Sequence, residues 1–102
     1  MSSEVNDAHT TASTTYHLSP GVKWVVETHG LILTNGKETV RHVFYPEAAI
    51  WDLISRGYRL HKIIPMMCAI ASLQTEQAEQ LVLKTLEEWA TVGFLTRENN
   101  DG

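Results

Sequence analysis

Hydrophobic residues in the first half of the chain occur in three short runs that have the composition of β-strands. Val22–Glu27 and Leu31–Thr34 are rich in β-branched and aliphatic residues, and two sets of side chains alternate along Glu38–Tyr45. Thr28–Gly30 would form the first turn. Asn35–Gly36 is a strong hairpin signal, because both residues tolerate positive φ. The pattern predicts a three-stranded antiparallel meander.

The hydrophobic spacing then becomes helical. Pro46 suits the first position of a helix, where its missing N–H is not needed, and an apolar face continues through Arg56. Gly57 is placed as the C-terminal cap of this helix. A second helix is predicted over Leu60–Ala71, and Pro65 within it is expected to kink, delay or break it.

A third helix is predicted from its end signals. Thr75 is the expected N-cap, the helix would run to Val92, and Gly93 would end it. Phe94–Leu95 would then return to the core, with the option of a short edge strand.

The order of these elements predicts an α+β domain that is winged-helix-like, with a three-stranded antiparallel sheet followed by three helices. We place this domain at residues 16–97. Residues 1–15 and 98–102 are polar and are expected to be disordered, because they cannot bury enough apolar surface to offset the entropy of ordering.

Composition narrows the class of protein. The chain has 102 residues, 43% of them hydrophobic, which is typical of one globular domain. It contains no apolar run of the about 18 residues that a membrane span needs, and its first residues do not resemble a signal peptide. Cys68 is the only cysteine, which excludes an internal disulfide framework. We therefore expect a cytoplasmic protein that does not bind membranes.

The net charge is −4. Four of the acidic residues, Glu4, Asp7, Glu98 and Asp101, lie in the polar end segments, so the domain itself is neutral. A neutral domain is not typical of nucleic-acid binding, which depends on neutralising phosphates.

Five stretches resemble, in their order and spacing, the PqqD family, also called the RiPP recognition element. They are Leu18–Val22, Ala48–Ile54 with Gly57, Ile63, Val82–Leu83 with Leu86–Trp89, and Gly93–Leu95.

The resemblance implies a peptide chaperone without catalysis or a cofactor, acting in cofactor or natural product biosynthesis. Members of the family hold the leader of a ribosomally synthesised precursor peptide and present the rest to a modifying enzyme, often a radical SAM protein. The leader would lie beside the third strand and against the third helix. The physical basis is β-augmentation, in which the free backbone groups of an edge strand bind the peptide backbone.

The residues allow such a site. Glu38–Tyr45 contains neither proline nor lysine, which usually blunt an exposed edge, and Arg41 would steer a charged peptide. Leu83 lies about 120° from the centre of the core stripe of the third helix, where it would form an apolar floor with Leu86. The candidate peptide-binding residues are Thr39, Val40, Arg41, His42, Val43, Phe44, Tyr45, Glu79, Leu83, Leu86, Glu87 and Ala90.

Alternatives remain for this surface. The edge could instead be covered by Phe94–Leu95 or by a second chain, which would give an edge-paired dimer in place of a monomer. Leu83 could be a lone exposed leucine. His42, alternating with Val40 and Phe44, could point inward.

Other functions find less support in the sequence. A winged-helix DNA-binding or regulatory module is the main alternative, but the third helix carries Glu76, Glu79, Glu87 and Glu88 against Lys84. The histidines lack the spacing of metal ligands, no glycine-rich phosphate loop is present, and Cys68 is expected to be a buried, inert thiol. We therefore expect no enzyme, no metal and no cofactor.

Overall fold

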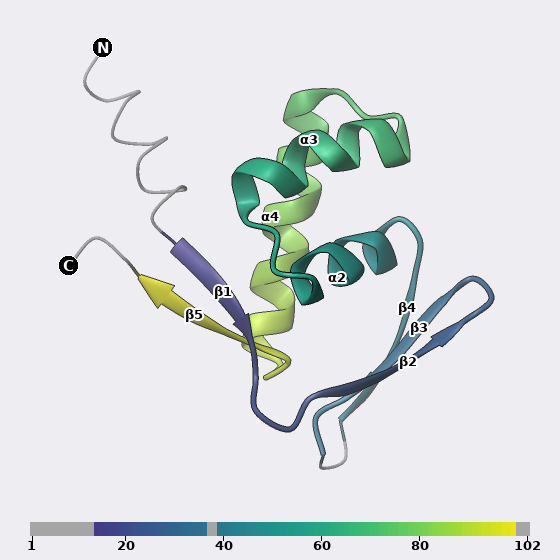
Figure 1. Ribbon diagram of the computed structural model, residues 1–102, viewed down its shortest axis with the longest axis vertical. Helices are drawn as coiled ribbons and strands as arrows, with labels where there is room; N and C mark the ends of the chain where they lie inside the picture. Colours follow the sequence, from purple (N-terminus) through teal and green to yellow (C-terminus); the bar gives the residue numbers. More distant parts are fainter. Residues whose placement is uncertain (1–13, 37–38, 100–102) are drawn as a thin grey trace.

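The computed structural model describes residues 14–36 and 39–99. The predicted α+β architecture is confirmed, with an antiparallel three-stranded sheet followed by three helices (Figure 1). The elements are β1 (Thr14–Leu18), β2 (Lys23–Glu27), β3 (Gly30–Thr34), β4 (Val40–Phe44), α2 (Glu47–Ser55), α3 (Leu60–Ala71), α4 (Thr75–Thr91) and β5 (Leu95–Asn99).

The strands form two separate sheets. One has the order β2-β3-β4, and the other is the antiparallel pair β1-β5. Figure 1 shows the β1-β5 pair on one side of the helices and the three-stranded sheet on the other. The helices therefore lie between the two sheets.

The β1-β5 pair was not predicted and moves both expected domain boundaries. Thr14 pairs with Asn99 and Leu18 with Leu95, so residues assigned to a disordered arm and tail belong to strands. The pair is stable because its inward side chains, Tyr16 and Leu95, are buried while its backbone groups bond each other. The rest of the expected arm and tail, residues 1–13 and 100–102, lies outside the described residues.

The two hairpins of the meander differ in their turns. Glu27 pairs with Gly30, so β2 and β3 are joined by a two-residue turn. Gly30 itself belongs to β3, where any larger residue would collide with the backbone carbonyl of Val43. Thr34 pairs with Val40, so the predicted Asn35–Gly36 turn is part of a longer connection.

The helix bounds agree closely with prediction, with three corrections. Helix α2 begins one residue after Pro46. Helix α3 continues through Pro65; this residue is exposed, and so is His61, whose backbone carbonyl loses its partner at the proline. Helix α4 has Gln74 rather than Thr75 as its N-cap, and the backbone N–H of Gln74 donates to the side chain of Gln77 at 3.1 Å. No helix among the described residues is long and apolar enough to cross a membrane.

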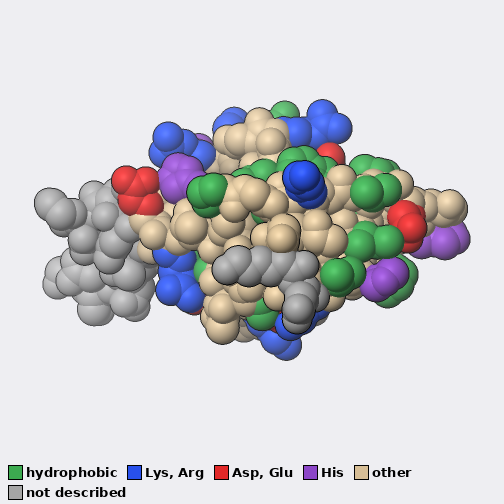
Figure 2. Space-filling model, turned by 90° about the horizontal axis from the view of Figure 1, so that it is seen from below, with side chains coloured by type: hydrophobic (Ala, Val, Ile, Leu, Met, Phe, Trp, Pro, Cys, Tyr) green, Lys and Arg blue, Asp and Glu red, His purple; other side chains and the backbone are tan. Residues whose placement is uncertain are grey.

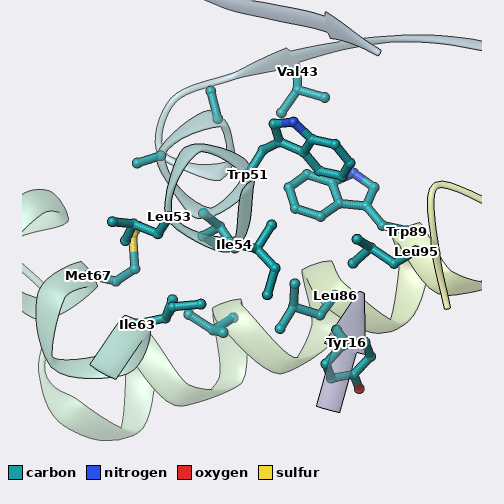
Figure 3. Close-up of a cluster of buried hydrophobic side chains, with 14 of the residues drawn as sticks. Tyr16, Val43, Trp51, Leu53, Ile54, Ile63, Met67, Leu86, Trp89 and Leu95 are labelled. Atoms are coloured by element: carbon teal, nitrogen blue, oxygen red, sulfur yellow. The ribbon is translucent and has the colours of Figure 1, made fainter. Parts of the chain in front are cut away.

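Three tryptophans connect the sheet to the helices. The ring of Trp51 on α2 makes edge-to-face contacts with Trp24 on β2, at 5.6 Å between centroids, and with Trp89 on α4, at 5.2 Å. Figure 3 shows Val43 of β4 above this cluster. Trp51 is fully buried, and no residue that the structure describes accepts a hydrogen bond from its indole N–H. The packing of the ring is therefore not reinforced by a polar anchor.

Strands β1 and β5 are fastened to α4 by a polar contact. Tyr16 and Arg97 are cross-strand partners, the Tyr16 hydroxyl donates to the Glu87 carboxylate, and Arg97 Nε lies 3.1 Å from the same carboxylate. Burial raises the pKa of Tyr16 well above its ordinary value of 10, and the hydrogen bond to Glu87 raises it further. The phenol therefore stays neutral in the folded protein under alkaline conditions that ionise an exposed tyrosine.

We expect Tyr16→Phe to lower the free energy of unfolding by about 1 kcal/mol at neutral pH, because it removes a partly buried hydrogen bond to a charged group. Tyr16 has a raised pKa in the folded state, so its stabilisation is complete below pH 10 and is lost as the pH rises further. The stability difference between the two proteins should therefore shrink above pH 10. Urea denaturation followed by tryptophan fluorescence measures it, with Tyr45→Phe at an exposed site as the control. A difference independent of pH contradicts this account.

Candidate peptide-binding site

Strand β4 lies at an edge of its sheet. Among the described residues it pairs only with β3, and its other side faces no strand. The alternative that Phe94–Leu95 covers this edge is wrong, because β5 pairs with β1 and the side chains of both residues are buried in the core. The edge expected from the sequence is therefore available within this part of the chain.

The register shows which backbone groups of β4 face outward. The carbonyl of Val43 lies against Gly30 of β3, so Val43 points its backbone groups into the sheet. Because this direction alternates along an antiparallel strand, the N–H and C=O groups of Val40, His42 and Phe44 point away from β3. These groups would form the ladder with an added strand.

A groove runs between β4 and α4. Its floor is formed by Val43, Thr85 and Trp89, which are all buried. Charged and exposed side chains surround this floor. The groove is lined by Arg41, His42, Val43, Phe44, Glu47, Thr85, Glu88 and Trp89. An extended chain on the β4 edge would therefore meet an apolar floor with a polar margin.

The charges around the groove are acidic in balance. Arg41 lies 3.8 Å from Glu88, and both side chains are about half exposed. Glu47 is a second carboxylate in the lining. Arg41 is thus already opposed by acidic groups, which weakens its expected role in steering an acidic peptide.

The predicted residues on β4 lie together as expected, with one error of orientation. Val40, Phe44 and Tyr45 are exposed, Val43 is buried, and Thr39 precedes the strand. His42 is exposed, so the alternative in which it points inward is wrong. It shares the outer face with Val40 and Phe44 because alternate strand residues point the same way.

The predicted residues on α4 lie away from the groove at β4. Leu86 has no exposed surface, whereas the floor residues Thr85 and Trp89 keep 6% and 5% of theirs, so Leu86 does not contribute to the floor. Leu83 and Ala90 are partly buried against the core, and Glu79 is half-buried. Glu87 binds Tyr16 and Arg97 on the β1-β5 side. None of these five lines the groove at β4.

Four groove residues were not predicted from the sequence: Glu47, Thr85, Glu88 and Trp89. Thr85 carried a usable signal, because it is the polar residue within the apolar stripe of α4 and is 6% exposed. Trp89 is buried in the core and also lines the groove. The direction of α4 relative to β4 decides the lining, and helical periodicity alone does not give that direction.

Other chemistry finds no site among the described residues. They contain no group of three His, Cys, Asp or Glu side chains arranged to hold a metal ion. Cys68 is a free, partly buried thiol next to the core, rather than a fully buried one. The chain matches no family model, no curated protein and no solved structure.

We expect Leu83→Asp to lower the free energy of unfolding, since Leu83 packs partly against the core and a charge there loses solvation. Leu83→Asp should weaken ligand binding in the β4 groove only to the extent that it lowers the fraction of folded protein. Thermal unfolding and ligand titration of the same samples separate the two. If Leu83→Asp is as stable as the wild type but binds the ligand more weakly, the binding site lies on the side of α4 that carries Leu83.

The Arg41–Glu88 pair should contribute little to stability. A double-mutant cycle with Arg41→Ala and Glu88→Ala is expected to give a coupling free energy below about 0.5 kcal/mol, because both side chains are solvated and the atoms are 3.8 Å apart. Both groups would then be free to exchange partners when a ligand binds. A coupling several times larger would indicate that the pair closes the groove.

Proposed function

We propose that this protein is a non-catalytic peptide-binding module that takes an extended peptide as an added strand on β4. The carrying observation is the unpaired edge of β4 beside a groove with a buried floor of Val43, Thr85 and Trp89. The backbone groups of the edge supply hydrogen bonds, and the groove selects side chains.

The other edge of the sheet supports binding less well. All residues of β2 are exposed, so its edge is also free among the described residues. However, β2 has Lys23 at one end and Glu27 at the other, and none of its residues lines the groove between β4 and α4. An added strand on β2 would gain backbone hydrogen bonds with little burial of its side chains.

The resemblance to the PqqD family supplies the biological part of the proposal. The peptide would be the leader of a ribosomally synthesised precursor, and the partner would be its modifying enzyme, with a radical SAM protein as the first candidate. The protein would act as a chaperone in the biosynthesis of a cofactor or natural product. A second copy of the chain paired through β4 would compete with the peptide for the same backbone groups.

DNA binding is the less favoured proposal. Helix α4 would have to approach phosphates while carrying Glu76, Glu79, Glu87 and Glu88 against Lys84. Basic residues gather instead near the start of α3, at Arg56, Arg59 and Lys62, and Arg56 is already bonded to Asp52 at 3.0 Å.

The test is selection of the full chain against a displayed library of random peptides, followed by amide chemical-shift titration with the selected peptide. Shifts should concentrate on Val40–Phe44 and on Thr85, Glu88 and Trp89. A proline at an outward-facing position removes a backbone donor without disturbing the β3 ladder. We therefore expect His42→Pro to weaken binding by up to about tenfold, which is the upper end of what one backbone hydrogen bond contributes.

The matched control is Val26→Pro on β2. Glu27 and Gly30 close a two-residue turn, so Glu27 points its backbone groups toward β3 and Val26 points its own outward. Both variants place a proline on an outer edge, and only His42→Pro should affect binding. Failure to select any peptide, equal effects of the two variants, or shifts confined to β2 would contradict the proposal. Duplex DNA, titrated in parallel, tests the alternative.

A further inference from the structure

We infer that the peptide bound by β4 has apolar side chains at alternate positions and a basic side chain at a position between them. The apolar side chains would share the outer face of the sheet with Val40 and Phe44, and the basic one would share the inner face with Arg41 and Val43. The inference rests on the proposed function and specifies the ligand. It follows from the two faces that an added strand would extend, because residues opposite each other in neighbouring strands share a face.

The outer face of the sheet carries exposed apolar side chains that no described residue covers. Val40 and Phe44 of β4 are 51% and 62% exposed. On the same face, Val25 of β2 is 63% exposed and lies opposite Ile32 of β3. Figure 2 shows hydrophobic side chains gathered with histidines toward the right-hand end of the view.

The exposed apolar groups follow the same alternation as the outward backbone groups. Val40, His42 and Phe44 are the positions whose N–H and C=O groups face an added strand, and their side chains all lie on the outer face. Apolar side chains of a peptide opposite Val40 and Phe44 would bury these two residues. Peptide polar groups there would leave both of them in water.

The inner face of the sheet borders the groove, whose charged margin is acidic in balance. Arg41 and Val43 point toward the groove, together with the carboxylates of Glu47 and Glu88. Two acidic groups against one basic group leave the groove short of a positive charge. A lysine or arginine on the inner face of the peptide would meet Glu47 or Glu88, whereas an acidic residue would be repelled by both.

The experiment uses the full chain and three synthetic, end-blocked peptides. The first is Thr-Val-Lys-Ile-Thr-Phe-Lys-Val-Thr, in which apolar residues alternate with lysine or threonine. The second, Thr-Lys-Thr-Val-Ile-Phe-Val-Lys-Thr, has the same composition with the apolar residues contiguous. The third replaces both lysines of the first peptide by glutamate. Calorimetric titration measures affinity, and amide chemical shifts locate each peptide.

The alternating lysine peptide should bind about tenfold more tightly than the contiguous one, which cannot place all its apolar residues on one face. It should bind about threefold more tightly than the glutamate peptide, because the charges at the groove are exposed. Phe44→Ser should weaken the alternating peptide by about fivefold, since it removes one large cross-strand contact. Val25→Ser, an equally exposed site on the same face but two strands away, should leave binding unchanged.

The outcomes separate the two proposals. Equal affinity for the alternating and contiguous peptides, or tighter binding of the glutamate peptide, with shifts on β4, overturns this inference and leaves strand addition intact. No binding of the alternating peptide also overturns it, because the library selection decides strand addition without assuming any sequence. Shifts on β2, accompanied by a loss of binding in Val25→Ser, would overturn both.

Discussion

The contact of Trp51 with Trp24 and Trp89 is the interaction on which the arrangement of sheet and helices depends. The three-stranded sheet contributes few buried side chains of its own, mainly Leu31, Leu33 and Val43. Its attachment to the helices therefore relies on large aromatic surfaces rather than on many small contacts. Edge-to-face geometry fixes the approach angle of such rings as well as their distance.

This attachment sets the position of the β4 edge relative to α4. Val43 packs above the tryptophans while its neighbours on either side in the strand turn outward (Figure 3). Trp89 belongs both to the cluster and to the groove lining. The same ring thus supports the fold and forms the floor on which a ligand would rest. A structural residue and a binding residue cannot be separated at this position.

The sequence was sufficient for the elements with strong local signals. The β2, β3 and β4 segments carry β-branched runs, and α3 was placed at its observed bounds from its hydrophobic period. Strand β1 was missed because Thr14–Leu18 is mostly polar, and its structure comes from pairing with residues at the other end of the chain. The residues predicted on α4 do not line the β4 groove for a related reason, since periodicity identifies the buried stripe of a helix but not the element that packs on each side of it. Contacts between distant parts of the chain, rather than local propensity, determine both the formation of β1 and the side of α4 that lines the groove.

The pairing of Thr14 with Asn99 also has a consequence for how the chain matures. During synthesis β1 leaves the ribosome before its partner β5, which emerges after all the described helices. Until then β1, which carries Tyr16, has no partner strand, and the ion pair between Arg97 and Glu87 cannot form. Contacts between residues so far apart in sequence form slowly, because the entropy cost of closing a long loop comes before the contacts contribute any stabilisation. The β1-β5 pair can therefore close on α4 only after the helices have been synthesised, on the side of the helices away from the three-stranded sheet.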